Sequence, residues 1–338
     1  MTQGENAVTL LDCTLRDSSY VVNFQFTALD TRNIFRGLEK AGLKMIEVGH
    51  GLGLGASSPR HGIAFESDTA YIESAVEVRD TAKIGAFFIP GIGTAEDLRD
   101  AHKAGLDFIR VGNNATEIEA TERDIATAVE LGLATHLNLM KTYAVAPAEL
   151  ARAAEMCRDW GLDSIYVVDS AGCMLPGQVA EYVRAIRDAT GLTLGFHCHN
   201  NLGLANANCL AALEAGAVYV DGTLRGMGRS AGNAQTEVLS YLLKEAGYPI
   251  DIDTFLLFET AERFLTPLVP LPQGHAPLDV VIGMSRFHSG HLPRFKRVLD
   301  KYDVDLNRLI MSVSRIDCVD PPEELIESVA RDLSRTDS

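Results

Sequence analysis

The sequence predicts a single (β/α)8 barrel followed by a small helical domain at the C-terminal end. Short apolar runs alternate with amphipathic helical stretches along most of the 338 residues, and about eight such pairs can be counted. This alternation indicates parallel strands joined by crossover helices, and eight pairs favour a closed barrel over an open sheet. The length suits one barrel of roughly 250 residues with a smaller unit appended.

The strands are predicted from the apolar runs, and the helices from apolar positions that recur with helical spacing. Several helical stretches end just before a glycine, such as Gly105, Gly132 and Gly161, and Pro147 and Pro176 suit a first helical turn. The predicted strands are Val8–Asp12, Met45–Val48, Ile84–Ile89, Phe108–Val111, Thr135–Leu139, Ile165–Val168, Thr193–Phe196 and Val218–Val220. The predicted helices include Ala95–Ala104, Glu122–Leu131, Pro147–Trp160, Pro176–Thr190 and Leu204–Ala215.

The composition changes near residue 248, which predicts a domain boundary there. Prolines follow at positions 249, 267, 270, 272 and 277. Two helical segments come next, the basic segment His291–Tyr302 and then Pro322–Leu333. We therefore expect a catalytic barrel over residues 1–248 and a helical domain over residues 249–338, packed at one end of the barrel.

The chain is acidic, with a formal net charge of −16 and a pI of about 5.0. This charge argues against binding of nucleic acid or of an anionic membrane surface. The polar residues 1–6 lack the order of a signal peptide, and no apolar run approaches the length of a membrane span. The six cysteines are scattered without a C-x-x-C pair, which is typical of reduced thiols. We therefore expect a soluble cytoplasmic protein.

Two motifs far apart in the chain predict one metal site. Asp17 follows the first predicted strand, and His197 and His199 follow the seventh. They can meet only if the strands are parallel and their carboxyl ends gather at one mouth, as in a barrel. The alternative is a surface aspartate and two histidines satisfied by local hydrogen bonds. The position of both motifs at strand ends favours a divalent metal held for Lewis-acid chemistry, and Mn²⁺, Co²⁺, Zn²⁺ or Mg²⁺ would fit.

Polar residues beside these motifs are candidates for substrate binding. Arg16 would stabilise an enolate or oxyanion on a 2-keto acid, or would form a salt bridge within the barrel. Asn201 follows the two histidines and could orient ligands or bind substrate. Asn233 lies in a glycine-rich loop after the last strand, and could be a further ligand or hold one in place.

Two other strand ends carry polar residues on the same predicted face. Glu47 and His50 end the second strand, and Ser170 ends the sixth. Each could line the site or belong to a satisfied polar layer inside the barrel mouth, and we favour the polar layer for Glu47. The aromatic stretch Phe87–Ile89 at the end of the third strand could shape a pocket or pack in the core.

Together these motifs resemble a known family. Asp12–Asp17 reads DCTLRD, His197–Asn201 reads HCHNN and Gly226–Asn233 reads GMGRSAGN. With Ile46–Gly51 and Val168–Gly172, they are similar to the hydroxymethylglutaryl-CoA lyase-like (DRE-TIM) metallolyases, a family of metal-dependent barrel lyases and synthases. The resemblance is best to the 4-hydroxy-2-oxovalerate aldolase branch, and it covers almost the whole chain.

The resemblance implies a class II pyruvate aldolase that joins a 2-keto acid, such as pyruvate, to an aldehyde or cleaves the product. Asp17, His197 and His199 match the metal ligands of the family, and Mn²⁺ is the metal we expect first. Arg16 would stabilise the enolate, Ser170 would help seat the carboxylate, and His50, Asn201 and Asn233 would contact substrate. The C-terminal part is similar to a communication domain, which implies an acylating aldehyde dehydrogenase or a second copy of the chain as partner.

Two positions depart from the family pattern. Tyr20 stands where the family has its catalytic histidine, and His288 aligns with a C-terminal tyrosine that reaches the substrate. Our hypothesis is that the roles are exchanged, with His288 as the base on the C4 hydroxyl and Tyr20 orienting substrate or donating a proton. A histidine titrates near neutral pH and suits a base, whereas a tyrosine would serve only if its pKa were lowered.

Two alternative functions remain open at this point. A Claisen-type enzyme that condenses an acyl-CoA with a 2-keto acid would need a basic CoA-binding patch, which the acidic composition mildly disfavours. A non-catalytic barrel that serves as a subunit or scaffold would not need the complete set of Arg16, Asp17, His197 and His199. Two branches of the family are disfavoured by missing residues. Hydroxymethylglutaryl-CoA lyase has a cysteine where Gly228–Ser230 holds none, and the biotin-dependent carboxyltransferase has a lysine where Val167–Asp169 holds none.

Overall fold

Eight parallel strands close into a barrel in which each strand pairs with its two neighbours along the chain. The computed structural model describes residues 8–269, 274 and 276–336. The first strand closes the ring by pairing with the eighth, with Thr9 opposite Tyr219. The predicted (β/α)8 barrel is confirmed. Its strands are β1 (Thr9–Asp12), β2 (Met45–Glu47), β3 (Lys83–Phe88), β4 (Phe108–Asn114), β5 (Ala134–Met140), β6 (Ser164–Asp169), β7 (Leu194–Cys198) and β8 (Tyr219–Gly222).

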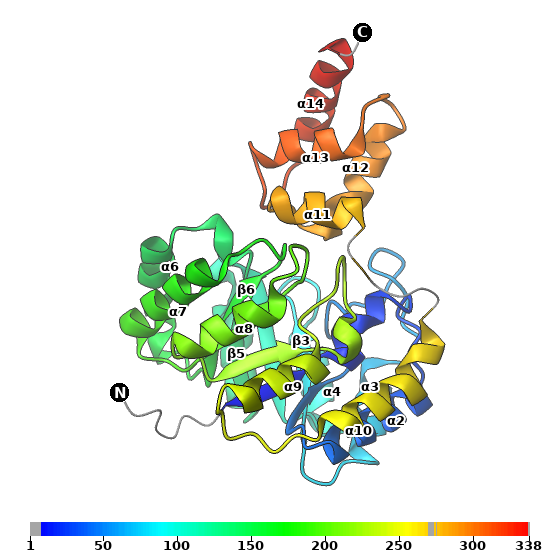
Figure 1. Ribbon diagram of the computed structural model, residues 1–338, viewed down its shortest axis with the longest axis vertical. Helices are drawn as coiled ribbons and strands as arrows, with labels where there is room; N and C mark the ends of the chain where they lie inside the picture. Colours follow the sequence, from blue (N-terminus) through cyan, green and yellow to red (C-terminus); the bar gives the residue numbers. More distant parts are fainter. Residues whose placement is uncertain (1–7, 270–273, 275, 337–338) are drawn as a thin grey trace.

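The helices of the barrel surround this ring of strands (Figure 1). At the start of α4, Thr94 accepts a hydrogen bond from the backbone N–H of Asp97, and Gly105 just after its end adopts a φ of 105°. The predicted helix Pro147–Trp160 is divided, because a 3-10 turn over Glu155–Asp159 follows α6. The helices are α1 (Thr14–Asp17), α2 (Ala28–Lys40), α3 (Asp68–Val76), α4 (Ala95–Ala104), α5 (Glu122–Glu130), α6 (Pro147–Ala154), α7 (Pro176–Thr190), α8 (Ala205–Glu214), α9 (Thr236–Glu245) and α10 (Thr254–Thr260).

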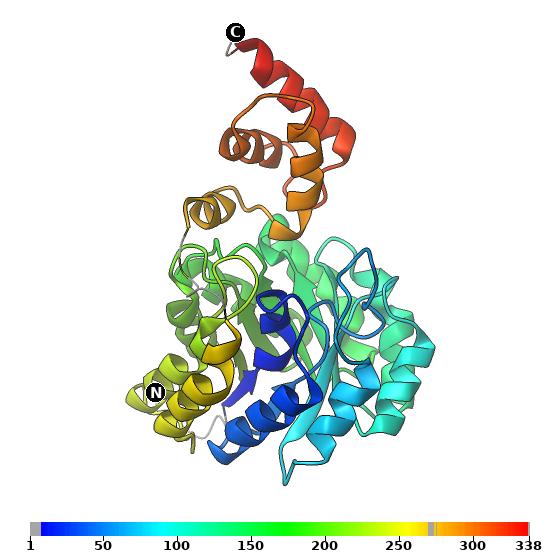
Figure 2. The ribbon, with the colours of Figure 1, turned by 90° about the vertical axis from the view of Figure 1, so that its right-hand side faces the viewer.

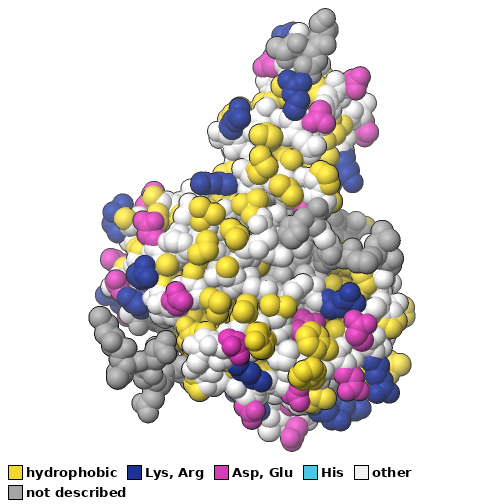
Figure 3. Space-filling view, in the orientation of Figure 1, with side chains coloured by type: hydrophobic (Ala, Val, Ile, Leu, Met, Phe, Trp, Pro, Cys, Tyr) yellow, Lys and Arg dark blue, Asp and Glu magenta, His cyan; other side chains and the backbone are white. Residues whose placement is uncertain are grey.

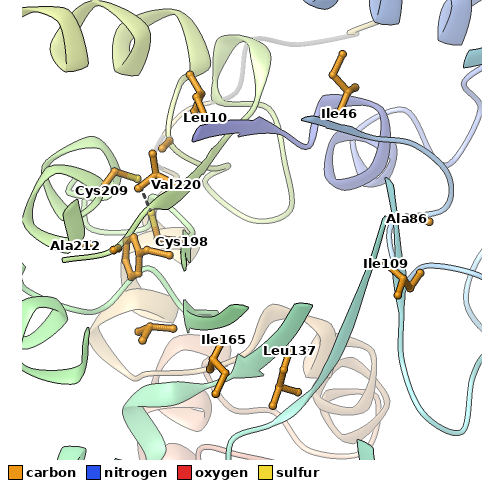
Figure 4. Close-up of a cluster of buried hydrophobic side chains, with 14 of the residues drawn as sticks. Leu10, Ile46, Ala86, Ile109, Leu137, Ile165, Cys198, Cys209, Ala212 and Val220 are labelled. Atoms are coloured by element: carbon orange, nitrogen blue, oxygen red, sulfur yellow. Dashed lines mark hydrogen bonds between the residues drawn. The ribbon is translucent and has the colours of Figure 1, made fainter. Parts of the chain in front are cut away.

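The main core lies between the strands and the surrounding helices, and each strand contributes to it (Figure 4). Cys198 of β7, for example, faces Cys209 of α8, with 3.9 Å between the two sulfur atoms. Inside the barrel, the apolar layer is small and centres on Leu11, Cys13 and Phe108. Burial of apolar surface between the layers is the main stabilising contribution to such a fold. The side chains labelled in Figure 4 that come from the eight strands are Leu10, Ile46, Ala86, Ile109, Leu137, Ile165, Cys198 and Val220.

The helical C-terminal domain has a second core of its own, which includes Phe287 and Phe295. By contrast, Ile252 and Leu257 are buried in the barrel core, because α10 packs against α2 and α9 and covers the place where the ring of helices closes. The two cores therefore divide after residue 269, later in the chain than the boundary predicted at residue 248. The helices of this domain are α11 (Pro277–Met284), α12 (Leu292–Leu299), α13 (Leu306–Ser314) and α14 (Glu323–Thr336).

The C-terminal domain stands over the carboxyl ends of the barrel strands (Figure 2). The amide nitrogen of Asn201 donates to the backbone oxygen of Asp279 at 2.9 Å, and the Ser230 hydroxyl donates to the Asp279 carboxylate at 3.0 Å. On the other side, the Lys141 ammonium donates to the backbone oxygen of Val319. These contacts join loops of the barrel mouth to the domain above them.

Acidic and basic side chains are interspersed on the face shown in Figure 3, with hydrophobic side chains between them. Within the described ranges, no helix combines the length and the apolar character that crossing a bilayer requires. Residues 1–6, from which we expect no signal peptide, lie outside the described residues.

The burial of Glu237 at the start of α9 can be tested by the pH dependence of the protein's stability. It is 4% exposed, and burial raises its pKa to about 7, although its carboxylate accepts hydrogen bonds from the backbone N–H of Arg225. Between about pH 4.5 and about pH 7 the folded protein therefore holds this proton more tightly than the unfolded chain does, and stability falls as the pH rises. The loss is about 3 kcal/mol at ~1.4 kcal/mol per pH unit.

We expect Glu237→Gln to remove that part of the pH dependence, because glutamine stays neutral and keeps an acceptor for the Arg225 N–H. Urea unfolding between pH 4.5 and 8 measures the difference in unfolding free energy between variant and wild type. Glu245→Gln, at an exposed position on the same helix, is the matched control. Parallel pH curves for wild type and Glu237→Gln would contradict the raised pKa.

Candidate active site and metal centre

A cavity of about 740 Å³ lies between the mouth of the barrel and the C-terminal domain. Its floor and walls come from strand ends and the loops that follow them, and its roof comes from α11 and the segment 288–293. Seven of the ten predicted site residues line it, and the other three lie beside it. Those that line it are Arg16, Asp17, Tyr20, Ser170, His197, His199 and His288.

The three predicted metal ligands come together in the floor of the cavity. Asp17 ends α1, the short helical turn that follows β1, and His197 and His199 stand at the end of β7. Their donor atoms all lie within 4.8 Å of one another, and Asp17 Oδ2 is 3.9 Å from His197 Nε2. All three side chains are buried. Residues some 180 positions apart in the chain thus form a compact group of metal-ligating atoms.

The hydrogen bonds behind the two histidines direct one nitrogen of each ring to this group. His197 Nδ1 is 2.8 Å from the carboxylate of Asp221, and His199 Nδ1 is 3.3 Å from the backbone oxygen of Gly232. Both partners accept a proton from Nδ1, so Nε2 is the nitrogen that would bind a metal ion. In the structure, His199 Nε2 lies 2.9 Å from Arg229 Nη2. Burial lowers the pKa of His199 to about 3, with Arg229 contributing, so the imidazole is neutral as a ligand must be.

The remaining atoms of the centre also fit a divalent cation. Burial alone would raise the pKa of Asp17, but Arg16 and the two histidines hold it well below its usual range, so it is a carboxylate. The amide nitrogen of Asn233 donates to Asp17 Oδ2, while its Oδ1 is buried with no hydrogen-bond partner. A buried amide oxygen beside a carboxylate and two imidazoles would suit a hard or borderline cation as an additional oxygen ligand.

A second group of metal-ligating atoms, Cys13, His197 and Asp221, lies deeper in the barrel. The guanidinium of Arg110 fills its position, because it donates to Cys13 Sγ at 3.1 Å and to the Asp221 carboxylate. Burial raises the pKa of Cys13 well above its usual value, which keeps the thiol protonated. A thiol and a carboxylate that already face a cation do not form a second metal centre.

A continuous series of buried charges supports the ligands from below. Glu47 accepts from Arg16 Nε at 2.9 Å and from Arg110 Nε at 2.7 Å. Arg110 donates in turn to Asp221, which holds His197. Burial by itself would raise the pKa of Glu47, but the two arginines keep it well below its usual range. The polar layer predicted for Glu47 is thus present, and it connects Arg16 to a metal ligand.

Arg16 is held beside the group formed by Asp17, His197 and His199. Besides Glu47, it contacts Asp17 Oδ1 at 3.0 Å, and its guanidinium lies 5.0 Å from the centre of the Phe87 ring. These contacts fix the side chain at the wall of the cavity, which Phe87 and Ile89 also line. The salt bridges foreseen for Arg16 are present, and its position at the cavity leaves the predicted role in stabilising an enolate open.

Ser170 lines the cavity at the end of β6 and accepts a hydrogen bond from the backbone N–H of Lys141 at 3.0 Å. Lys141 follows β5 with a φ of 57°, a conformation that few residues other than glycine adopt. This backbone conformation turns the lysine side chain into the cavity, where burial lowers its pKa to about 8.

Tyr20 and His288, whose residue types are exchanged relative to the family pattern, lie in different parts of the cavity wall. Tyr20 belongs to the turn after α1, and burial raises its pKa to about 12, so its phenol stays protonated. His288 comes from the C-terminal domain and contacts the guanidinium of Arg229. Burial, together with Arg229 and Lys141, holds the pKa of His288 well below its usual value, so its imidazole is neutral. A proton donor and a proton acceptor therefore face the same cavity.

Three of the predicted substrate contacts do not line the cavity. Both ring nitrogens of His50 face the backbone, at Gly62 O and at Leu52 N, and the ring stacks on Phe24 at 4.1 Å. Asn201 donates to Ser230 and Asp279 and joins the two domains. Asn233 contacts Asp17, so it supports the ligand group rather than the substrate space. For these residues, the structure favours roles in holding the site together.

Four residues that contribute to the site were not predicted from the sequence: Arg110, Asp221, Lys141 and Arg229. A signal existed for Arg110 and Asp221, because each interrupts an apolar strand, and a charge inside a barrel needs a partner. Lys141 and Arg229 lie in loops after strand ends, where their side-chain directions depend on the local backbone. No pattern in the sequence indicates those directions.

Comparison with known proteins is consistent with this geometry. The model of the HMGL-like family matches residues 7–263. The chain is 39% identical over 333 residues to "4-hydroxy-2-oxovalerate aldolase 2" of Rhodococcus opacus (strain B4), covering 98% of this chain and 96% of the relative. It is 38% identical over 328 residues to "4-hydroxy-2-oxovalerate aldolase" of Carboxydothermus hydrogenoformans, covering 97% and 98%.

A solved structure with the same fold is the carboxyl transferase domain from Rhizobium etli pyruvate carboxylase. It superposes with a TM-score of 0.78 at 17% identity, over 97% of this chain and 61% of that one. At this level of identity, the similarity extends to the fold alone.

Proposed function

The chain belongs to the HMGL-like family, and from that premise we propose that it is a divalent-metal-dependent aldolase of 4-hydroxy-2-oxo acids. It would cleave such an acid to pyruvate, or a related 2-oxo acid, and an aldehyde, or run the addition in reverse. The observation that carries the proposal is the group of Asp17, His197 and His199 beside Arg16 in the floor of one cavity. The aldolase names of near full-length relatives support it.

Asp17, His197 and His199 would hold the cation, with Asn233 adjacent. When bound, a divalent cation supplies Lewis-acid polarisation of the 2-oxo group. Arg16 then faces the oxygen on which negative charge develops as the enolate forms, and its permanent charge lowers the energy of that state. Ser170 would help seat the carboxylate of the substrate. Mn²⁺ is our first choice of metal, because mixed carboxylate and imidazole ligands suit it, with Mg²⁺, Co²⁺ and Zn²⁺ as alternatives.

In the cleavage direction, the bond between C3 and C4 breaks and its electron pair passes to the pyruvate enolate. The C4 hydroxyl loses its proton to a base, and C4 becomes the carbonyl carbon of the aldehyde. A proton then adds to C3 to give pyruvate. We assign His288 as the base, because its neutral imidazole can accept a proton, and Tyr20 as a donor or orienting group, because its phenol keeps its proton.

Exchange of the C3 protons of pyruvate for deuterium, followed by NMR, is the first test of the proposal. With Mn²⁺ or Mg²⁺ we expect exchange far above the rate in buffer, and with a chelator we expect it to disappear. Exchange requires enolate formation but no aldehyde, so it tests the site before the second substrate is known. No exchange with any of the four metals would contradict an aldolase that uses pyruvate.

The exchanged roles of Tyr20 and His288 predict a separation of two half-reactions. In His288→Ala we expect cleavage of 4-hydroxy-2-oxovalerate to fall by about 10²–10⁴-fold, as for removal of a general base. Pyruvate C3 exchange should persist, since it needs no proton transfer at C4. His102→Ala, at an exposed position on α4 away from the cavity, is the matched control. Cleavage at a near-normal rate in His288→Ala would contradict the assignment.

A Claisen-type condensation of an acyl-CoA remains the second candidate. Its distinguishing result is release of free thiol from acetyl-CoA in the presence of a 2-keto acid. A barrel that serves only as a subunit would show neither thiol release nor metal-dependent exchange.

We also propose that the C-terminal domain contacts a second subunit, either an acylating aldehyde dehydrogenase or another copy of the chain. Met284 and Ile316 in this domain are 61% and 66% exposed, which supports a contact surface there. Light scattering would detect a homo-oligomer as a multiple of 36.6 kDa.

We further propose that the enzyme is cytoplasmic, where its six free cysteines would stay reduced.

A further inference from the structure

The cavity holds more positive charge than a substrate with one carboxylate needs, in a chain whose net charge is −16. Of the two carboxylates that line it, Asp17 belongs to the metal group, and both oxygens of Asp279 already accept hydrogen bonds, from Ser230 and from Ala276. The cationic side chains that line it are Arg16, Arg60, Lys141 and Arg229. An anionic ligand larger than pyruvate would balance this excess.

Arg229 is a cation of the cavity wall that forms no direct ion pair in the described residues. Arg16 faces Glu47 and Asp17, whereas no ion pair joins Arg229 to a carboxylate anywhere in the described parts of the chain. Its Nη2 lies 2.9 Å from His199 Nε2 and 3.5 Å from the backbone oxygen of Ser170. Its Nη1 donates to the ring of His288. All three partners are uncharged, so the half-buried guanidinium has no counter-ion in direct contact.

Arg229 is positioned to contact the half of the substrate that becomes the aldehyde. His199 Nε2 is the atom that a metal ligand needs, so a bound cation would take this acceptor from Arg229 and leave the guanidinium to another partner. Arg16 and Ser170 already serve the 2-oxo acid half in the proposed function. Arg229 instead contacts the roof of the cavity at His288, the residue assigned to the C4 hydroxyl. The groups that follow C4 therefore lie within its reach.

Lys141 adds a second cation on the same side. It is 6% exposed, its ammonium donates to the backbone oxygen of Val319, and the described residues include no ion-pair partner for it. Arg229 contacts the ring of His288, and the backbone oxygen of Val319 that accepts from Lys141 also lies 3.0 Å from His291 Nε2, three residues after His288. An arginine fork and a buried ammonium on two sides of one space are typical of a site for a carboxylate.

We propose that Arg229, with Lys141, binds a carboxylate on the aldehyde half of the substrate, so that the preferred substrates are 4-hydroxy-2-oxo dicarboxylic acids. The inference rests on the proposed aldolase function and adds the class of its substrate. Cleavage follows the balance given above, and the aldehyde product keeps the second carboxylate. Arg229 is then the residue that distinguishes an acidic aldehyde from a neutral one.

Binding of two unreactive analogues tests the proposal without turnover. 2-Oxoadipate and 2-oxohexanoate have the same chain length, lack the C4 hydroxyl and differ only in a terminal carboxylate or methyl group. By calorimetry with Mg²⁺ present, we expect the wild type to bind 2-oxoadipate about 10- to 100-fold more tightly, as for a charge-assisted contact. In Arg229→Leu the preference should fall to within about threefold, whereas Arg229→Lys should keep part of it.

Arg123→Gln, at an exposed position on α5, removes the same charge away from the cavity and should keep the full preference. Addition of pyruvate to succinic semialdehyde or to butanal, two aldehydes of four carbons, should show the same ratio in kcat/KM. Equal binding of the two analogues by the wild type would overturn the proposal, and so would a preference that survives in Arg229→Leu.

A third outcome would also overturn it. If Arg229→Leu weakens oxalate, an analogue of the 2-oxo acid half, as much as 2-oxoadipate, Arg229 serves the first carboxylate instead. Failure of the aldolase function itself would appear separately, as absence of metal-dependent pyruvate exchange, because the analogues report binding whether or not cleavage occurs.

Discussion

Replacement of Asp17 by asparagine should abolish both metal binding and pyruvate exchange while the barrel stays folded. Asp17 is the only carboxylate among the three predicted ligands, and it contacts Arg16 and Asn233 as well. Asparagine keeps the size of the side chain and one of its two acceptor oxygens but removes its charge. We expect Mn²⁺ affinity to fall by at least about 100-fold, since even residues that merely orient ligands contribute about 10- to 100-fold.

The exchange rate should fall further, by about 10³-fold, because Lewis-acid stabilisation of developing charge amounts to several kcal/mol. Electron paramagnetic resonance measures free Mn²⁺ directly, and NMR measures exchange on the same samples. Asp188→Asn, at an exposed position on α7, is the control that removes one carboxylate elsewhere. Tight Mn²⁺ binding that persists in Asp17→Asn would contradict the assignment of the metal centre.

Replacement of Arg110 by methionine should be the most destabilising change of a single charge in the barrel. Arg110 is fully buried between Glu47 and Asp221, and its guanidinium also lies 5.0 Å from the centre of the Tyr166 ring. Methionine fills much of the volume but leaves the buried Asp221 carboxylate without its arginine and Glu47 with Arg16 alone. Removal of one partner from a buried ion pair costs about 3–5 kcal/mol, so we expect a loss of that size in unfolding free energy.

An exposed ion pair of the same chemistry provides the comparison. Arg32 contacts Glu77 at 2.9 Å, with 33% and 61% of the two side chains exposed. Arg32→Met should cost less than about 1 kcal/mol, because water screens the pair. Chemical unfolding of both variants measures the two losses. If Arg110→Met does not fold, Arg110→Lys keeps the charge without the planar fork and should show an intermediate loss. Similar losses for Arg110→Met and Arg32→Met would contradict the buried network.

Local signals in the sequence were sufficient for most of the barrel. α4 and α7 have the predicted ends because capping residues, proline and glycine mark them, and these act over one helical turn. β4 continues past the predicted end at Val111 to Asn114, since pairing with β5 extends a strand beyond its apolar run. The early domain boundary has a similar cause. Prolines mark the start of irregular chain, but only packing shows that α10 still covers the barrel.

The metal group was predictable because parallel strands of a barrel share one functional end, so motifs after β1 and β7 must approach each other. The directions of His50, Asn201 and Asn233 were not, because each depends on which backbone or side-chain group lies nearest after the loops fold. The polar layer around Glu47 was foreseen, but its two arginine partners come from α1 and β4 and were not.

The sequence by itself determined the order of strands and helices, the barrel and the residue types of its metal group. These follow from periodicity, from caps and from the rule that strand ends meet, all of which act locally or through topology alone. The tertiary structure decided the charge balance of the cavity, the reach of Arg229 and Lys141 into it and the entry of His288 from the second domain. Such features depend on distances between residues far apart in the chain, and electrostatic interactions depend on those distances and on burial.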